Sequence, residues 1–278
     1  MTASKSDIRL SVQQVRKVYG AGSRNEVEAV RSLTFDLHAG EFACLVGPSG
    51  SGKTTLLKCI AGLLDPTSGE VVLDGKRVSG PAEGMAVVFQ EYSRSLFPWL
   101  SVEDNVELPL KTSGVPKAER KARVKDALEA VTLSHAAKSY PWQLSGGMQQ
   151  RVAIARAVAS NPSVLLMDEP FAAVDAQTRG ELEDLVREVW KRLDMTILFV
   201  THDIDESVYL AERVLVLSSS PTIVQADIHI DLPDVRSQAD TRSLHRFGEL
   251  RHQVYEEVQF AKTNPGGERM SVRDGLPS

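Results

Sequence analysis

The feature that most constrains the fold of this 278-residue chain is a glycine-rich segment placed directly after a short apolar run. Phe42–Val46 reads as a buried strand before the segment, and residues 54–60 open a helix after it. Because glycine lacks a Cβ, such a backbone can approach a phosphate closely, and the helix presents free N–H groups to the anion. The segment matches the phosphate-binding pattern G-x-x-x-x-G-K-[ST], and its residues are Gly47, Pro48, Ser49, Gly50, Ser51, Gly52, Lys53 and Thr54.

Side chains at the end of this phosphate loop have expected roles in binding a nucleotide. Lys53 is expected to reach the β- and γ-phosphates, and the Thr54 hydroxyl to hold Mg²⁺. Thr55, the next residue of the helix, is expected to belong to the same nucleotide contact. The alternative is a glycine-rich turn between a strand and a helix that arose by chance and binds nothing.

Composition limits the compartment and the partners of the chain. The net charge of −5 argues against nucleic acid as the main partner, and 42% hydrophobic with 25% charged residues is typical of a soluble globular protein. We find no apolar run near the ~20 residues that span a bilayer and no signal-peptide pattern, so we expect a cytoplasmic protein that meets a membrane only through a partner. Cys44 and Cys59 are expected to be small core residues without a disulfide.

Hydrophobic patterning predicts two kinds of sheet. Residues 8–37 contain two alternating segments typical of antiparallel strands, and the turn Asp74-Gly75 predicts a hairpin. Continuous apolar runs at 164–167, 196–200 and 214–217 alternate with helical patterns, which favours a largely parallel sheet with helices on both faces. The predicted class is α/β: a phosphate-loop NTPase core with an N-terminal antiparallel β subdomain and an inserted α-helical subdomain.

The expected domain boundaries follow from these hydrophobic patterns. We expect a flexible N-terminus at 1–7, an ATPase domain at 8–232 with its helical insertion at about 91–160, a C-terminal helical extension at 233–262, and a disordered tail at 263–278.

Polar side chains follow four of the apolar runs, at the sheet edge where parallel α/β folds bind ligands. Asp168 is expected to contact Mg²⁺, unless it only caps a helix or pairs with a cation. Glu169 is a candidate general base, Gln90 a contact for metal or water, and His202 a partner of the γ-phosphate. A lone Gln or His at a strand end is also compatible with a purely structural role.

A second anion-binding turn lies outside this pattern. Ser145 is a good N-cap, and Gly146 and Gly147 leave the first amides of its helix open. No strand leads into the turn, so the phosphate it meets is not given by the sheet. One answer is a nucleotide held by another copy of the chain; the alternative is an ordinary Ser-capped helix with glycines for packing.

The residues around this turn carry a family resemblance. Residues 144–157 resemble the signature motif of the ATP-binding cassette (ABC) family, and residues 47–54 and 164–169 resemble its two nucleotide motifs. The resemblance implies a head-to-tail dimer with two ATP molecules, each held by one phosphate loop and by the signature turn of the other subunit. The signature residues acting in trans would be Ser145, Gly146, Gly147 and Gln149.

The same resemblance assigns further roles. Tyr19 would stack on adenine, and Asp175 would communicate across the dimer, in a loop where the family commonly has Leu in place of Val174. Glu169 would be the general base, His202 the γ-phosphate sensor, and Gln90 a metal and water contact.

A finer resemblance is to the ATPases of nitrate, sulfonate and taurine importers. It rests on Leu96-Phe97-Pro98-Trp99-Leu100, Met148-Gln149-Gln150-Arg151 and the residues around Asp168 and Asp175. Residues 219–223 depart from it, because members often carry an Arg-Pro-Gly-Arg-Ile-like turn there. It implies an ATPase subunit, peripheral at the cytoplasmic face of the inner membrane, that drives anion import through permease subunits and indirectly a solute-binding protein.

Several alternatives remain at this stage. They are an importer for another class of solute, a soluble non-transport ABC ATPase, a nucleotide kinase or GTPase, and an interaction protein with an inactive site. The sequence contains no Asn-Lys-x-Asp motif, which would specify guanine in a GTPase. It also contains no sustained heptad repeat, which a soluble ABC ATPase split by a long coiled coil would carry. The solute, and whether the ATPase pair is a homodimer or a heterodimer, are not readable from these residues.

Overall fold

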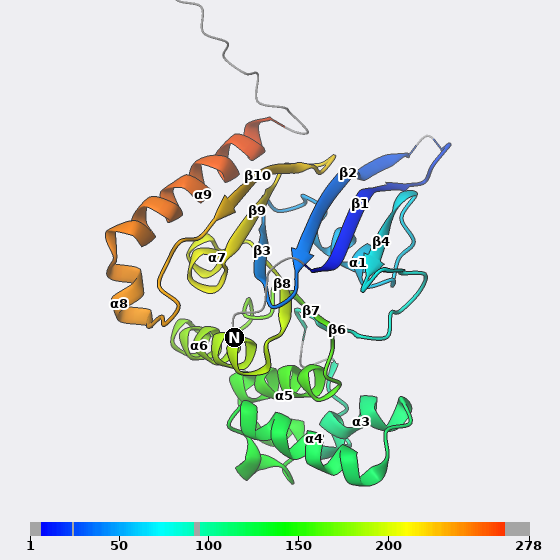
Figure 1. Ribbon diagram of the computed structural model, residues 1–278, viewed down its shortest axis with the longest axis vertical. Helices are drawn as coiled ribbons and strands as arrows, with labels where there is room; N and C mark the ends of the chain where they lie inside the picture. Colours follow the sequence, from blue (N-terminus) through cyan, green and yellow to red (C-terminus); the bar gives the residue numbers. More distant parts are fainter. Residues whose placement is uncertain (1–6, 24, 92–94, 265–278) are drawn as a thin grey trace, which may run out of the picture.

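The computed structural model describes residues 7–23, 25–91 and 95–264, which form two sheets with helices packed around them (Figure 1). The predicted tail at 263–278 lies outside this range except for its first two residues, and the predicted flexible N-terminus lies outside it except for Asp7. In the described part of the chain, no helix is long and apolar enough to cross a membrane.

The N-terminal sheet is antiparallel, as predicted. Its strands lie in the order β2-β1-β4-β5. At the tip of the β4–β5 hairpin, Asp74 and Gly75 have φ angles of 49° and 75°, which is the turn expected of an Asp-Gly pair. The strands are β1 Ile8–Tyr19, β2 Val27–His38, β4 Ser68–Leu73 and β5 Lys76–Arg77.

The second sheet has six strands in the order β10-β9-β3-β8-β7-β6. All neighbours are parallel except β10, which pairs antiparallel with β9 at one edge, so the prediction of a largely parallel sheet is confirmed. The carboxyl ends of the parallel strands therefore meet at one edge of the sheet. The strands are β3 Phe42–Val46, β6 Met85–Val88, β7 Val164–Asp168, β8 Thr196–Thr201, β9 Arg213–Leu217 and β10 Val224–His229.

The two faces of this sheet are covered differently. Because successive side chains of a strand point to opposite faces, Cys44 joins a core shared with the helices, while Leu45 joins a second core shared with the antiparallel sheet. The second face is thus covered by α1 (Lys53–Ile60) together with that sheet, and not by helices alone as the alternation had suggested. Cys44 and Cys59 are both buried and unpaired, as expected.

The helical insertion lies beyond β6, at the bottom of Figure 1. It consists of α3 Val102–Thr112, α4 Lys117–Ala130 and α5 Gly146–Ala159, with two short 3₁₀ turns, η1 Ser134–Ala136 and η2 Pro141–Gln143. Helix α4 buries Val124 and Leu128 against the other two helices.

The remaining helices complete the face shared with the first core. They are α6 Ala176–Leu193, α7 Ile204–Leu210, α8 Gln238–Ser243 and α9 His245–Thr263. Helix α9 lies along β9, β10 and α7, at the left of Figure 1, and buries Phe247, Leu250 and Val254. Leu244 occupies the N-cap position of this helix and is 40% exposed.

Candidate nucleotide site

The phosphate loop joins β3 to α1, where the sequence predicted it. Gly52 is the N-cap of α1 with φ 80°, a left-handed conformation that glycine adopts without strain. A Cβ on Gly47 would lie 2.9 Å from the Leu217 carbonyl oxygen, so the loop passes too close to β9 for a larger residue. The two glycines are therefore required by conformation and by space.

Lys53 is folded over this loop. Its Nζ donates to the carbonyl oxygens of Gly47 at 2.9 Å and Pro48 at 3.0 Å, and the residue is 6% exposed. Burial lowers the pKa of Lys53, while Glu169 and Asp168 oppose this effect. The ammonium group thus lies inside the loop that a phosphate would enter, near two carboxylates.

An oxygen-donor pair lies beside the loop. The Thr54 hydroxyl donates to Oδ1 of Asp168, the last residue of β7, at 3.4 Å. Asp168 is buried, and burial raises its pKa, with a smaller contribution from Glu169. A hydroxyl and a carboxylate are ligands that Mg²⁺ accepts, and a cation here would favour the ionised form of Asp168, so the pair fits the predicted metal site. Gln90 is exposed, two residues beyond the end of β6 at Val88.

Glu169 and His202 are brought together from neighbouring strands. His202 Nδ1 lies 3.0 Å from Glu169 Oε2. The Glu169 backbone has φ 42°, an uncommon conformation for this residue type, and its N–H donates to the Val200 carbonyl at 2.8 Å. Both side chains line a hollow of about 50 Å³, which is large enough for a water molecule. The pair therefore borders a small hollow that it shares with Arg179 and Glu206.

A positioning contact behind this pair was not predicted. Arg179 Nη1 lies 3.3 Å from Asp203 Oδ2, and Asp203 also caps α7 by accepting from the Glu206 N–H. Because Asp203 follows His202 directly, the contact ties the histidine to the first turn of α6. An Asp at a helix start was a readable signal for the cap, but nothing in the sequence pointed to the arginine.

Tyr19 lies beside the start of α1. Its hydroxyl is 3.3 Å from Thr55 Oγ1, and 42% of the residue is exposed. Lys17 Nζ is 5.5 Å from the centre of the ring, a cation–π contact. The structure thus brings the ring predicted to stack on adenine next to the phosphate loop.

The signature turn begins α5, on the helical insertion. Ser145 caps the helix, as predicted, by accepting from the Met148 N–H at 3.3 Å, and Ser145 and Gly146 are both exposed. Gly147 is buried, and a Cβ on it would lie 2.4 Å from Thr178 Cγ2, so this glycine is also required for packing on α6. The packing alternative therefore applies to Gly147 without excluding an anion at the exposed amides.

Two other residues with predicted trans roles make contacts within the chain. Gln149 Nε2 donates to the Pro141 and Leu144 carbonyls at 3.0 and 3.3 Å, which fixes η2 against α5. Asp175 accepts from the Thr178 N–H and hydroxyl at 3.0 and 2.7 Å, and these bonds lower its pKa. Asp175 is the N-cap of α6.

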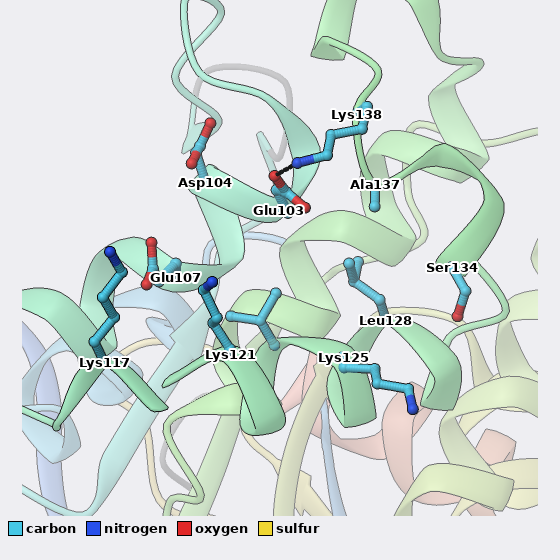
Figure 2. Close-up of a pocket in the computed structure, with 11 residues that line it drawn as sticks. Glu103, Asp104, Glu107, Lys117, Lys121, Lys125, Leu128, Ser134, Ala137 and Lys138 are labelled. Carbon is cyan, nitrogen blue, oxygen red and sulfur yellow. Dashed lines mark hydrogen bonds and ion pairs between the residues drawn. The ribbon is translucent and has the colours of Figure 1, made fainter. Parts of the chain in front are cut away.

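A cavity of about 580 Å³ lies in the helical insertion, between α3 and α4, and it contains none of the residues predicted to bind nucleotide. Figure 2 shows carboxylates from α3 facing lysines from α4, with Lys138 paired to Glu103. The mixture of both charge signs is unlike a phosphate site. The charged residues of the lining are Glu103, Asp104, Glu107, Lys117, Lys121, Lys125 and Lys138.

Comparison with known proteins decides the family. The family model described as ABC transporter matches residues 30–172. The chain belongs to the ABC transporter family. It is an ABC-type ATPase, which excludes the nucleotide kinase and GTPase alternatives.

Relatives and solved structures agree with this assignment. The chain is 47% identical over 226 residues to the nitrate import ATP-binding protein NrtD of Synechocystis sp., which covers 81% of this chain and 84% of that protein. It is 41% identical over 253 residues to the aliphatic sulfonates import ATP-binding protein SsuB of Bacillus cereus, covering 90% and 96%.

Two solved ABC structures share the fold. The dimeric ATP-binding cassette MJ0796 in a post-hydrolysis state with ADP and Pi superposes with a TM-score of 0.69 at 33% identity, covering 80% of this chain and 98% of that chain. The cbiO1 subunit of Clostridium perfringens, part of the ABC transporter complex cbiONQ, has a TM-score of 0.72 at 30% identity, covering 80% and 89%. The predicted fold class is confirmed.

Proposed function

We propose that this chain is the ATP-hydrolysing subunit of an importer for an anion such as nitrate, a sulfonate or taurine. The similarity to nitrate and sulfonate import proteins over more than four fifths of the chain supports the import assignment. The second candidate is an importer for another solute class. Residues 219–223 favour this alternative, because they differ from the Arg-Pro-Gly-Arg-Ile-like turn that the anion importers often carry. A soluble non-transport ABC ATPase finds no support in these relatives.

The observation that carries the proposal is the Glu169–His202 pair beside the Lys53 loop. In our proposal the loop amides and Lys53 hold the β- and γ-phosphates of ATP. Glu169 accepts a proton from the attacking water, and His202 fixes the Glu169 carboxylate and contacts the γ-phosphate.

Mg²⁺ is the metal that this site would take. Thr54, Asp168 and Gln90 would hold it, and it would neutralise charge on the β- and γ-phosphates. Burial of Asp168 supports this assignment, because a buried carboxylate is costly unless a cation accompanies it.

A second copy of the chain would complete the site. The exposed Ser145 and Gly146 amides would meet the γ-phosphate of the ATP held by the partner copy, and Tyr19 would stack on adenine within its own copy. Asp175 would carry the state of one site to the other. The dimeric state of the MJ0796 cassette supports this arrangement.

Transmembrane permease subunits would be the membrane partners, with a solute-binding protein acting through them. We place the chain at the cytoplasmic face of the inner membrane, bound peripherally. The proposed contact is the surface around Gln90 and residues 97–99: Trp99 is 69% exposed, and its ring centre lies 5.4 Å from that of Phe97. Asn105 holds this turn, because its side chain bonds the Phe97 N–H and carbonyl at 2.8 and 3.1 Å.

Replacement of the two rings tests the permease contact. The Phe97→Ala and Trp99→Ala variants should lose co-purification with the permease while keeping ATP binding. Tyr255→Ala is the matched control, because Tyr255 is 50% exposed on α9, away from this turn. Unchanged permease binding and transport in both variants would refute the contact.

Reconstitution tests the function itself. The chain should be co-expressed with its membrane partner, purified as a complex and placed in liposomes with the solute-binding protein. Nitrate, an alkanesulfonate or taurine should stimulate ATP hydrolysis in the parent complex and not in the Glu169→Gln complex. Stimulation by an unrelated solute alone would refute the anion assignment and leave the ATPase assignment intact.

A further inference from the structure

The turn after β9, residues 219–223, is the segment that departs from the importer resemblance, and the structure places it against the phosphate loop. Ser220 Oγ donates to the Gly50 carbonyl at 3.2 Å. Thr222 Oγ1 contacts the Ser51 carbonyl, and Thr222 is fully buried. Two carbonyls in the middle of the loop are thus faced by hydroxyls from a turn about 170 residues away in sequence.

The turn is itself held at both ends. At one end, the Ser219 N–H and hydroxyl both donate to the Ala261 carbonyl, at 3.2 and 3.0 Å, near the carboxyl end of α9. At the other end, the Thr222 N–H donates to the Ala29 carbonyl at 3.2 Å, and the Thr222 carbonyl accepts from the Arg31 N–H at 3.0 Å. The hydroxyls are therefore presented from a fixed support between α9 and β2.

The phosphate loop needs such a support. Gly50 and Gly52, on either side of Ser51, have φ angles of 78° and 80°, and glycine imposes no conformation of its own. A loop that must be ordered when ATP binds loses conformational entropy, which lowers affinity, whereas a loop already held in place loses less. The Ser220 and Thr222 hydroxyls, which also lie 3.3 and 3.0 Å from the Ala29 carbonyl oxygen, link the two loop carbonyls to β2 and so hold the segment from outside.

We propose that Ser220 and Thr222 are positioning residues for the phosphate loop, and that their hydroxyls raise the affinity for ATP by fixing the Gly50 and Ser51 carbonyls. The proposal rests on the assignment of residues 47–54 as the nucleotide loop. The turn then has a role in nucleotide affinity in addition to its backbone hydrogen bonds with β2.

Isosteric replacement tests the proposal in the full-length chain. Thr222→Val keeps the volume and removes the hydroxyl, and its Kd for ATP should rise about three- to tenfold, the range expected for one lost hydrogen bond. Thr222→Ser should bind ATP within about twofold of the parent, because it restores the donor. Ser220→Ala, at an exposed position, should raise the Kd about two- to threefold.

Thr196→Val is the matched control. Thr196 is 2% exposed, and its hydroxyl accepts from the Gly40 N–H at 3.0 Å, at the opposite end of β8 from the site. This variant should lose thermal stability as Thr222→Val does, yet bind ATP as the parent does. Equal ATP affinity in Thr222→Val and the parent would overturn the proposal, as would an equal loss in Thr196→Val.

The Ser220→Ala and Lys53→Ala variants keep the result decisive. If Thr222→Val fails to fold, parent-like ATP affinity in Ser220→Ala overturns the proposal and a raised Kd supports it. Lys53→Ala separates the nucleotide role of the loop from the positioning role of the turn. If this variant binds ATP as well as the parent, the assignment of residues 47–54 as the nucleotide loop fails. If it does not, a negative result at Thr222 counts against the positioning role alone.

Discussion

The molecule carries two turns suited to anions, and they are built in opposite ways. The charged groups of the phosphate loop site are enclosed by their own chain: Lys53 and Asp168 are 6% and 5% exposed, although the loop residues Ser49, Gly50 and Thr54 are exposed, and hydroxyls from a distant turn contact the loop carbonyls. The signature turn at Ser145 and Gly146 is exposed, and its one hydroxyl is occupied in capping its own helix. One half of a site is therefore prepared within the chain, and the other half faces outward.

The electrostatics of the enclosed half also suit a bound phosphate and a bound cation. Burial lowers the pKa of Lys53 and raises that of Asp168, so burial disfavours the charged form of both groups. A phosphate beside the lysine and a cation beside the aspartate would each favour the charged form again. The signature turn offers backbone amides and a helix N-terminus, which attract an anion without any titratable group.

The largest expected effect comes from the enclosed half. Glu169→Gln should lower ATP hydrolysis by about 100- to 1000-fold, because a general base contributes about that much, while ATP binding should remain near the parent level. Single-turnover hydrolysis and ATP titration measure the two quantities. Glu181→Gln, an exposed carboxylate on α6, should hydrolyse ATP as the parent does. Turnover that survives Glu169→Gln would remove Glu169 from the mechanism.

An intermediate effect is expected at the exposed half. Ser145→Asp keeps a good N-cap but adds a negative charge where the partner's phosphate should lie, so hydrolysis should fall about 10- to 100-fold with folding stability unchanged. Ser145→Asn is the neutral capping control and should retain most activity. Equal ATP hydrolysis by Ser145→Asp and Ser145→Asn would contradict the proposed role of the exposed half. Weaker ATP binding to the single chain in Ser145→Asp would contradict it as well.

The smallest effect on hydrolysis concerns a buried carboxyl group close to the Glu169–His202 pair. Burial raises the pKa of Glu206 to about 8, and Glu183 and Asp203 add to this, while Thr201 and Arg179 oppose it. Glu206 is ionised in the unfolded chain from about pH 4.5 but in the folded chain only from about pH 8, so folding stability is lost as pH rises across that window.

Glu206→Gln should remove this loss, leaving a stability profile flatter by up to about 5 kcal/mol between the two pH values, since one pKa unit corresponds to about 1.4 kcal/mol. Denaturant titrations at several pH values measure it. Glu256→Gln, exposed on α9, should follow the parent profile. Parallel profiles for Glu206→Gln and the parent would show that this carboxyl group titrates normally.

The sequence predicted what depends on local pattern. Phe42–Val46, Val164–Asp168 and Thr196–Thr201 are strands because their apolar runs suit a sheet buried on both faces, and polar residues end them at a common edge. Ser145 and Asp175 are caps because their short side chains reach the amides three residues on.

The contacts that could not be predicted join residues far apart in sequence. Thr222 meets Ser51 only because β9 lies beside β3, and Arg179 meets Asp203 only after α6 packs near the start of α7. The amide of Gln149 is used within its own chain because η2 folds back against α5. The local periodicity of a sequence does not indicate which distant segments will pack together.

In the proposed mechanism, the enclosed and exposed halves complete one another only between two copies of the chain. The direct measurement is the mass of Glu169→Gln by light scattering, with and without saturating Mg-ATP. We predict the mass of one chain without nucleotide and of two chains with it, and reversal to one chain when Ser145→Asp is added. A mass of one chain at saturating Mg-ATP, in a variant shown to bind ATP, would contradict the account.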